Sequence, residues 1–247
     1  MICVVLAAGY ATRMYPLTEN FPKPLLDVQG KTVMDWLLED VDTISDITEY
    51  VIISNHRFLS HFEDWKKQCK LTHPVVLVDD LSTENDNRLG AVKDIVFAIE
   101  TLSLDDDLLV LAGDNVLEFS LKGFVDFFYS KQATCIMTHY EESQERLKRT
   151  GVALLGEDSL VLEMAEKPQQ PKSNWAVPPF YVYKREDLPR IQKAIEDGCN
   201  IDAPGFLIAY LCNWSQVYAY EMPGRRLDIG NLESYEEVKK DFKGRKV

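Results

Sequence analysis

Residues 6–24 read Leu-Ala-Ala-Gly-Tyr-Ala-Thr-Arg-Met-Tyr-Pro-Leu-Thr-Glu-Asn-Phe-Pro-Lys-Pro, and they continue the apolar run Ile2–Leu6. The apolar run predicts a short buried strand that leads into a loop of small residues around Gly9. Small residues let backbone N–H groups approach an anion closely. Arg13 and Lys23 add the positive charge that a triphosphate needs. The stretch therefore predicts a nucleotide-binding loop at the start of an α/β domain.

Strand-like and helix-like segments alternate through the first half of the chain. The strand-like segments are short apolar runs, and the helix-like segments carry apolar residues at helical spacing. This order predicts a Rossmann-like, mainly parallel sheet with right-handed crossovers, flanked by helices. The predicted strands are Ile2–Ala7, Glu49–Ser54, Val75–Val78 and Leu108–Leu111, and the predicted helices are Val33–Thr43, Phe58–Cys69 and Arg88–Leu102.

The second half of the chain predicts a mixed arrangement of strands and helices. A hairpin is expected at Val152–Leu155 and Val161–Ala165, and a last helix at Leu232–Phe242. The 247 residues suit one large core, and no linker or internal repeat divides them. We therefore expect a single domain. Residues 1–120 would form its nucleotide-binding half, and residues 121–247 its acceptor side and C-terminal helix.

The composition is ordinary for a globular protein, with 46% hydrophobic residues, but the net charge is −13. Such an acidic surface repels polyanions, so we expect no binding to nucleic acid or to an anionic membrane. No apolar run approaches the roughly 20 residues that span a bilayer, and we expect no signal peptide. The five scattered cysteines lack C-x-x-C spacing, which favours reduced thiols and a cytoplasmic location.

The opening stretch resembles the signature of the sugar-1-phosphate nucleotidyltransferases, also called nucleoside-diphosphate-sugar pyrophosphorylases. That signature is an apolar strand, Ala-Ala-Gly-x-Gly-Thr-Arg, Pro-x-Thr and then Pro-Lys. Further landmarks follow in the family's order: Gly-Asp at 113–114, Glu-Lys-Pro at 166–168 and Asp-Ile-Gly-Asn-Leu-Glu-Ser-Tyr at 228–235. Two positions depart from the pattern, since Ala11 replaces a glycine found in many members and Asn231 replaces a threonine. Alanine still allows close backbone approach if its φ is negative.

The resemblance implies a GT-A-like nucleotidyltransferase fold and a reaction between two phosphate compounds. A sugar 1-phosphate attacks the α-phosphorus of a nucleoside triphosphate, which gives a nucleotide-sugar and pyrophosphate. Because the attacking phosphate is already anionic near neutral pH, the protein must supply positioning and charge neutralisation rather than a base. The expected partners are therefore a nucleoside triphosphate and a phosphorylated small-molecule acceptor.

The same resemblance assigns roles to residues on the nucleotide side. Arg13 is the candidate for holding the triphosphate, because its planar fork suits phosphate oxygens. Lys23 is the candidate for drawing the α-phosphate and the attacking phosphate together. The other expected nucleotide-binding residues come from the opening loop and from the position of the family's base-recognition loop: Leu6, Ala7, Ala8, Gly9, Tyr10, Ala11, Thr12, Arg88 and Gly90.

Asp114 and Asp228 are the expected metal ligands, with Mg²⁺ as the cofactor. Mg²⁺ takes oxygen ligands, commonly one or two carboxylates together with substrate phosphates. It would bridge the α-phosphate and the sugar phosphate and screen their repulsion. The neighbouring Asn115 is a weaker candidate and is interpreted as a turn residue.

Three residues are expected to bind the acceptor. Lys167 resembles the family lysine that contacts the sugar phosphate, and Glu166 would accept hydrogen bonds from sugar hydroxyls. Gly151 resembles a family glycine whose backbone faces the sugar.

One departure from the family pattern leaves the identity of the acceptor undecided. Residues 177–181 read Val-Pro-Pro-Phe-Tyr, where the family often has Ala-Gly-x-Tyr in its sugar pocket. Two prolines remove backbone donors and stiffen the wall, which favours a second hypothesis. In it the protein is a CTP-dependent cytidylyltransferase acting on a small non-hexose phosphate. A third hypothesis is a catalytically inactive nucleotide-sensing subunit, against which the intact charged residues argue. The base and the oligomeric state stay open, and a homo-oligomer is compatible with the sequence.

Overall fold

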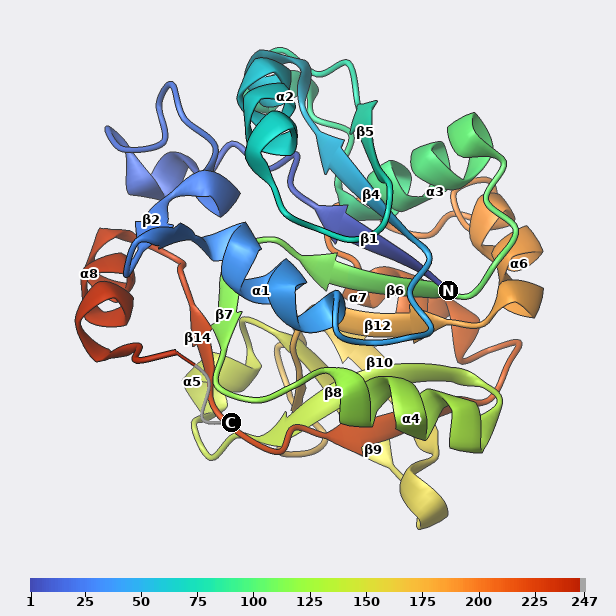
Figure 1. Ribbon diagram of the computed structural model, residues 1–247. Helices are drawn as coiled ribbons and strands as arrows, with labels where there is room; N and C mark the ends of the chain where they lie inside the picture. The colour runs from blue at the N-terminus through green and yellow to red at the C-terminus, as the bar shows by residue number, and fades with distance from the viewer. Residues whose placement is uncertain (245–247) are drawn as a thin grey trace. The chain divides into compact units, whose positions relative to one another are not determined.

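The computed structural model describes residues 1–244, which fall into two compact units (Figure 1). Unit 1 comprises Met1–Arg88, Ala112–Lys122 and the chain from Pro223 onward. Unit 2 comprises Leu89–Leu111 and Gly123–Met222. Each unit thus draws on both predicted halves of the sequence. The last three residues of the predicted single domain lie outside the described range.

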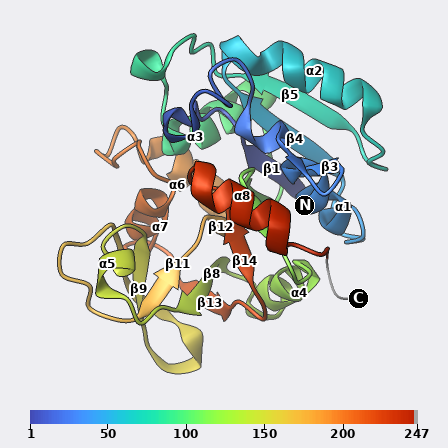
Figure 2. The same ribbon diagram turned by 90° about the vertical axis from the view of Figure 1, so that its left-hand side faces the viewer.

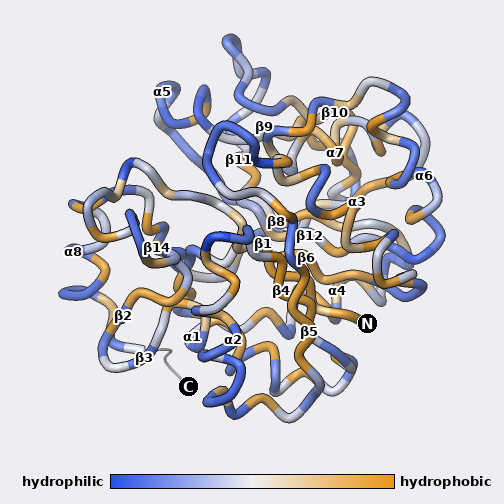
Figure 3. Tube along the Cα trace, turned by 90° about the horizontal axis from the view of Figure 1, so that it is seen from above, coloured by the Kyte–Doolittle hydropathy of each residue, from blue (hydrophilic) through white to orange (hydrophobic). Residues whose placement is uncertain are grey.

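Unit 1 is built on three parallel strands, in the order β1-β4-β5. Their bounds are Ile2–Leu6 for β1, Glu49–Ser54 for β4 and Val75–Asp79 for β5. The strands are apolar runs, and Figure 3 shows β1 and β4 as hydrophobic. Helix α1 (Val33–Val41) connects β1 to β4, and α2 (Leu59–Gln68) connects β4 to β5. The predicted parallel sheet with helical crossovers is confirmed here.

Side-chain caps mark the start of α1 and of the turn before α2. Asp35 N donates to Thr32 Oγ1 at 3.0 Å, and Thr32 N donates to Asp35 Oδ2 at 3.1 Å, so these two residues form a capping box at α1. A 3₁₀ turn, His56–Phe58, precedes α2, and Asn55 caps this turn by accepting from Phe58 N. Helix α1 ends at Val41, two residues before its predicted end.

Two short antiparallel strand pairs complete unit 1, and no pattern in the sequence predicts either pair. One joins β2 to β3, and the other joins β7 to β14 and sets Asp228 opposite Asn115. Strand β14 leads into α8, which Asn231 caps (Figure 2). The bounds are Asp27–Val28 for β2, Lys31–Thr32 for β3, Asn115–Leu117 for β7, Arg226–Asp228 for β14 and Leu232–Asp241 for α8.

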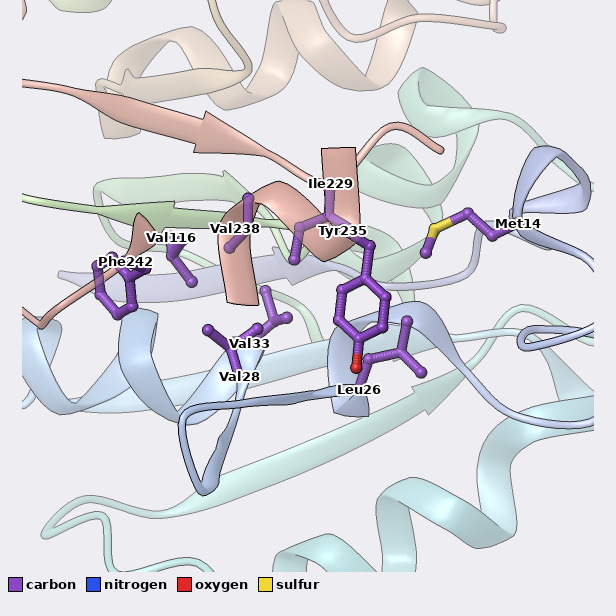
Figure 4. Close-up of a cluster of buried hydrophobic side chains, with 9 residues drawn as sticks. All are labelled: Met14, Leu26, Val28, Val33, Val116, Ile229, Tyr235, Val238 and Phe242. Atoms are coloured by element: carbon purple, nitrogen blue, oxygen red, sulfur yellow. The ribbon is translucent and has the colours of Figure 1, made fainter. Parts of the chain in front are cut away.

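A buried apolar cluster joins these pieces of unit 1 (Figure 4). Its side chains come from the loops after β1, from α1 and from the β7, β14 and α8 region. The Tyr235 hydroxyl also donates to the Asp27 carbonyl at 2.7 Å. The cluster thereby fixes the start of α8 and the residue after Asp228. Its members are Met14, Leu26, Val28, Val33, Val116, Ile229, Tyr235, Val238 and Phe242.

Unit 2 contains a largely antiparallel sheet in the order β10-β9-β11-β8-β12-β6, with β13 parallel to β8. The predicted hairpin is confirmed as β9 and β10, and the second half is mixed as expected. The bounds are Leu108–Ala112 for β6, Thr134–Tyr140 for β8, Gly151–Leu155 for β9, Val161–Glu166 for β10, Trp175–Val177 for β11, Phe180–Tyr183 for β12 and Val217–Glu221 for β13.

Helices accompany the sheet of unit 2. Tyr220 of β13 contacts the rings of Phe124 and Phe127 in α4, with centroid distances of 5.8 and 5.4 Å. Helix α3 begins at Ala91, three residues later than predicted, because Gly90 has a φ of +92°. No helix within residues 1–244 is long and apolar enough to cross a bilayer. The bounds are Ala91–Leu102 for α3, Lys122–Lys131 for α4, Gln144–Leu147 for α5, Leu188–Lys193 for α6 and Gly205–Leu211 for α7.

Candidate active site

The small-residue loop is fastened to the ends of β4 and β5. Ala7 N donates to the Ile53 carbonyl at 2.9 Å, which continues the strand pairing by one residue. The buried Asn55 amide donates to the Ala8 carbonyl at 2.9 Å. The Tyr10 ring is buried, and its hydroxyl lies 3.2 Å from Ser82 Oγ. The loop is therefore held through the Ala7 N–H, the Ala8 carbonyl and the Tyr10 side chain.

The N–H groups of this loop are left available. From Gly9 to Arg13, no backbone N–H donates a hydrogen bond within the described part of unit 1. A Cβ placed on Gly9 would meet nothing within 4 Å, so the space above the loop is open. Free N–H groups on a short, open loop are suited to phosphate oxygens.

The backbone at Ala11 differs from the expectation drawn from the sequence. Its φ is +47° and its ψ +42°, in the left-handed region, whereas close backbone approach was expected only with a negative φ. The conformation is held by Thr18, a fully buried residue whose hydroxyl donates to the Ala11 carbonyl at 2.8 Å. Alanine thus takes here the conformation that glycine adopts without strain.

Lys23 lies against two groups from distant parts of unit 1. Its ammonium donates to Asp114 Oδ2 at 2.5 Å and to the Ile229 carbonyl at 2.7 Å. The Lys23 side chain is only 12% exposed. The segment after Lys23 packs closely on β1 and on Gly113, where an added Cβ would meet Pro24 and Val5. Gly113 therefore allows Asp114 to come within reach of the lysine.

Asn115 and Arg226 hold the two expected metal ligands. The Asn115 amide donates to Asp114 Oδ1 at 2.7 Å, and its own oxygen accepts from Arg226 Nη1 at 2.7 Å. The same Nη1 lies 4.0 Å from Asp228 Oδ1. Asn115 is a fully buried strand residue, so its interpretation as a turn residue is wrong. Sequence reasoning also missed Arg226, whose only signal was its place two residues before Asp228.

The cluster contains carboxylates and cationic side chains, and these act on the pKa of Asp228 in opposite directions. Burial and then the negative charge of Asp114 raise the pKa of the Asp228 carboxyl, although half of its side chain remains accessible. The positive charges of Arg226, Lys23 and Arg13 act in the opposite direction on that pKa. The Arg13 side chain is exposed and makes no hydrogen bond within the described residues. It is therefore available to a ligand near Asp228.

The carboxylates of Asp114 and Asp228 suit a hard divalent cation whose remaining ligands come from other molecules. Two carboxylates with unfavourable mutual repulsion are the oxygen donors that Mg²⁺ uses. Residues 1–244 contain no group of three or more His, Cys, Asp or Glu side chains able to hold a metal. A metal held by Asp114 and Asp228 would therefore take its remaining ligands from substrate phosphates and water.

In unit 2, the Glu166 carboxylate lies between two glycines. A Cβ on Gly205, at the start of α7, would run into Glu166 Oε2, and a Cβ on Gly151 would collide with Met164 and lie 3.1 Å from the same oxygen. Glu166 stands opposite Gly151 in the β9–β10 pair, so both face the same side of the sheet. The carboxylate accepts no hydrogen bond within the described residues, and burial raises its pKa. Such a carboxylate is prepared to accept hydrogen bonds from a ligand.

Asp202 links the other expected residues of unit 2. Its carboxylate lies 4.0 Å from Lys167 Nζ, and its charge further raises the pKa of Glu166. Its carbonyl accepts from Ala91 N at 3.4 Å, beside Gly90, where a Cβ would collide with the Ile201 carbonyl. The structure thus brings Gly90 and Lys167 together through a residue that the sequence analysis did not name.

Arg88, the other residue expected at the base-recognition loop, belongs to unit 1. Its Nη1 donates to the Asn85 carbonyl at 3.1 Å, so part of the guanidinium is used within its own loop.

Comparisons with known proteins agree with these features. The nucleotidyl transferase family matches residues 2–244. A protein of Sulfolobus acidocaldarius, provisionally named a mannose-1-phosphate guanyltransferase, is 32% identical over 95% of this chain and 61% of its own length. A Clostridium novyi glucose-1-phosphate adenylyltransferase is 24% identical over 98% of this chain and 66% of its own. The chain thus spans about two thirds or less of the length of these curated relatives.

Solved structures agree on the fold. A Bacillus anthracis structure, provisionally described as a glucose-1-phosphate thymidylyltransferase, superposes with a TM-score of 0.81 at 21% identity. It covers 100% of this chain and 98% of its own. The architecture is therefore that of the GT-A-like nucleotidyltransferases, with a parallel first part and a mixed second part. Together with the family match over residues 2–244, this shows that the chain belongs to the nucleotidyl transferase family.

Proposed function

We propose that this protein transfers a nucleoside monophosphate from a nucleoside triphosphate to a sugar 1-phosphate and releases pyrophosphate. The observation that carries the proposal is the contact of Lys23 with Asp114 at 2.5 Å, beside Asp228 and Arg13. This arrangement places the exposed Arg13 guanidinium and the hydrogen-bonded Lys23 ammonium near two carboxylates. It suits the neutralisation of two phosphates that must approach each other. The names of the relatives support a sugar 1-phosphate as the acceptor.

The proposed reaction is an in-line displacement at phosphorus. An oxygen of the acceptor phosphate forms a bond to the α-phosphorus, and the bond from the α-phosphorus to the bridging oxygen of the β-phosphate breaks. The bonding electrons leave with pyrophosphate, and no proton needs to be removed from the acceptor. The free N–H groups of Gly9–Arg13 and the Arg13 guanidinium would hold the triphosphate.

Lys23 would act between the two reacting phosphates. Two of its three ammonium protons are engaged by Asp114 and the Ile229 carbonyl, which fixes the direction of the third. A charge held in place before the reaction needs no reorganisation as negative charge develops, so it stabilises the transition state more than a mobile lysine would.

We propose Mg²⁺ as the metal that Asp114 and Asp228 would hold. When bound, it would supply positive charge that screens the repulsion between the α-phosphate and the acceptor phosphate. Asn115 and Arg226 keep the two carboxylates oriented for this purpose.

In unit 2, Glu166, Lys167 and the backbone at Gly151 would bind the acceptor. Glu166 has unused acceptor capacity, and Lys167 is half exposed and weakly paired at 4.0 Å, so each can form a new bond. Pro178 is buried beside Val177 in the adjoining wall, and this keeps a small non-hexose phosphate as the alternative acceptor.

The test is pyrophosphate release with Mg²⁺, crossing each nucleoside triphosphate with a panel of phosphorylated acceptors. Release with one triphosphate and a hexose 1-phosphate is the expected result and would identify the base. Release only with CTP and a small phosphomonoester would replace the sugar by the alternative acceptor. A folded protein that binds a nucleotide but releases no pyrophosphate with any pair would overturn the enzymatic proposal in favour of a nucleotide sensor.

Two further properties belong to this proposal. All five cysteines are free thiols, as a reducing cytoplasm would keep them. A homo-oligomer is compatible with the proposed activity, and sedimentation of the purified protein would establish it.

A further inference from the structure

A cavity of about 390 Å³ lies in unit 1, and none of its lining residues has been assigned to the nucleotide or the metal. Its volume is within the range of small-molecule sites. The wall is formed by the segment around Lys23, by the start of α1 and by one side of α2. The lining residues that matter here are Phe21, Leu25, Asp35, His61, Asp64 and Trp65.

Among residues 1–244, the charged side chains that line the cavity are two carboxylates, Asp35 and Asp64, and no lysine or arginine. Asp35 is held in place, because Oδ1 accepts from Trp65 Nε1 at 2.8 Å and Oδ2 accepts from Thr32 N at 3.1 Å. A carboxylate accepts about four hydrogen bonds, so Asp35 keeps unused capacity. Lys67 pairs with Asp64 at 2.8 Å on the exposed side of α2, where water screens the pair.

The rest of the wall is aromatic. Phe21 packs edge-on against His61 of α2, with ring centroids 5.1 Å apart. Trp65, one turn further along the same helix, is buried. The His61 imidazole makes no hydrogen bond within the described residues, which leaves a polar group of the wall without a protein partner. Aromatic rings beside carboxylates form the environment in which organic ammonium groups bind.

We propose that this cavity binds a small organic cation, an ammonium group carried on an apolar or aromatic body. The aromatic wall would take the body, and Asp35 and Asp64 would take the charge. A metal ion would gain little from such a wall, and an anion would be repelled by it.

The position of the cavity suggests what its occupant does, a step that rests on the proposed function. Phe21 and Leu25 stand two residues before and two residues after Lys23, and both contribute to the wall. Lys23 opens the 3₁₀ turn Lys23–Leu25. An occupant that contacts both flanking side chains would hold the backbone of the turn that carries Lys23, in addition to the contacts of its ammonium with Asp114 and the Ile229 carbonyl. Occupancy is expected to raise the turnover number of nucleotidyl transfer.

Binding is tested on the full chain without nucleotide, by calorimetry with phenethylammonium, 2-phenylethanol and 3-phenylpropionate. These probes share a phenyl body but differ in charge. The expected order is tightest binding of the cation, with about fivefold weaker binding of the alcohol and no binding of the carboxylate. Equal affinity of the three probes, or no binding of the cation, would overturn the proposal.

Variants locate the bound probe. Asp64→Asn is expected to weaken phenethylammonium about threefold, as removal of one screened charge should. Asp35→Asn should weaken the binding of phenethylammonium more. If loss of the capping box unfolds α1 in that variant, the result for Asp64→Asn decides the test. Glu63→Gln removes the same charge from the same helix but outside the cavity, so it is the matched control. An equal effect of Glu63→Gln would refute the assigned site.

The effect on turnover separates the two proposals. Phenethylammonium should raise the rate of pyrophosphate release with a half-effect at its measured dissociation constant. Binding without any change in an active enzyme would refute the link to Lys23. Binding to a protein that transfers no nucleotide at all would overturn the proposed function and leave the cation site standing.

Discussion

Lys23 is the residue on which the proposed reaction depends most. Its ammonium is largely removed from water and is held by a carboxylate and a carbonyl, and its one remaining proton would be offered to a phosphate. A lysine in solution would have to lose rotamer freedom and water before it could do the same. Two other residues are also held in states that a ligand can use: the backbone of Ala11 is left-handed, and the half-buried Glu166 carboxylate accepts no hydrogen bond within the described residues.

Replacement of Lys23 by Ala is expected to lower the turnover number roughly 10²–10³-fold, the effect of removing one preorganised donor. The fold should survive, because Lys23 belongs to no helix or strand interior. Steady-state pyrophosphate release measures the loss. Lys31→Ala is the control, since Lys31 is an exposed lysine paired with Glu39 and should keep wild-type rates.

Replacement of Ala11 by Gly is expected to stabilise the protein by about 0.5–1 kcal/mol. Relief of the left-handed strain exceeds the added entropy of the unfolded chain. Urea unfolding measures the change. Ala8→Gly, at a loop alanine without a positive φ, should instead destabilise. A loss of stability in both variants would contradict this account of Ala11.

The stability of Glu166→Gln relative to wild type should depend on pH. Burial raises the folded-state pKa of Glu166 above its ordinary value of 4.5. The contribution of this group to stability is therefore complete below about pH 4.5 and is lost as the pH rises through the folded-state pKa. The melting temperature of the variant, relative to that of the wild type, should therefore rise between about pH 4 and pH 8. A difference that stays constant with pH, or that Glu163→Gln reproduces, would be inconsistent with this reading.

Among the elements, the short β7–β14 pair is decisive for the site. It is three residues long on each strand, yet its register sets Asp228 opposite Asn115 and beside Asp114. The long apolar strands of unit 1 were predictable because their burial requires continuous apolar runs. Segments of three residues carry no periodicity, so neither this pair nor the role of Asn115 was predictable from sequence.

The same limit explains the other misses. Asp202 reaches Lys167 through a tertiary contact that spans 35 residues of sequence, and no local pattern reports such a contact. The φ of Ala11 is set by the Thr18 hydrogen bond and by packing. In contrast, Lys23, Asp114 and Asp228 were predictable as a set because their motifs are distinctive, although their mutual distances were not.

Asn115→Ala is expected to weaken Mg²⁺ about 10–100-fold, the usual effect of removing a group that orients a metal ligand. Loss of the amide removes the donor to Asp114 Oδ1, while Oδ2 keeps Lys23, and it leaves Arg226 without its hydrogen-bond acceptor. The Mg²⁺ concentration for half-maximal pyrophosphate release measures the shift. Asn213→Ala, at an exposed amide in unit 2, is the control and should leave the Mg²⁺ requirement unchanged.

For the whole molecule, net charge and site charge have opposite signs. The chain carries −13 overall, while Arg13, Lys23 and Arg226 make one small region receptive to anions. At low ionic strength the long-range field therefore opposes the approach of a triphosphate, and salt screens that field first.

The second-order rate constant for the triphosphate should consequently rise between about 10 and 100 mM salt at fixed Mg²⁺. A neutral probe of encounter, such as an uncharged quencher of tryptophan fluorescence, should show no such rise. If kcat/KM fell steadily with salt instead, local positive charge would govern the encounter and the whole-molecule argument would be wrong.

The central claim is that Lys23, Asp114 and Asp228 together perform nucleotidyl transfer. The most direct measurement follows both products of the wild type and of Lys23→Ala and Asp228→Asn, using the pair of substrates identified in the panel. We predict equal amounts of nucleotide-sugar and pyrophosphate from the wild type and a loss of at least about 10²-fold in both folded variants. Wild-type rates in either variant, or triphosphate hydrolysis without a nucleotide-linked product, would contradict the account.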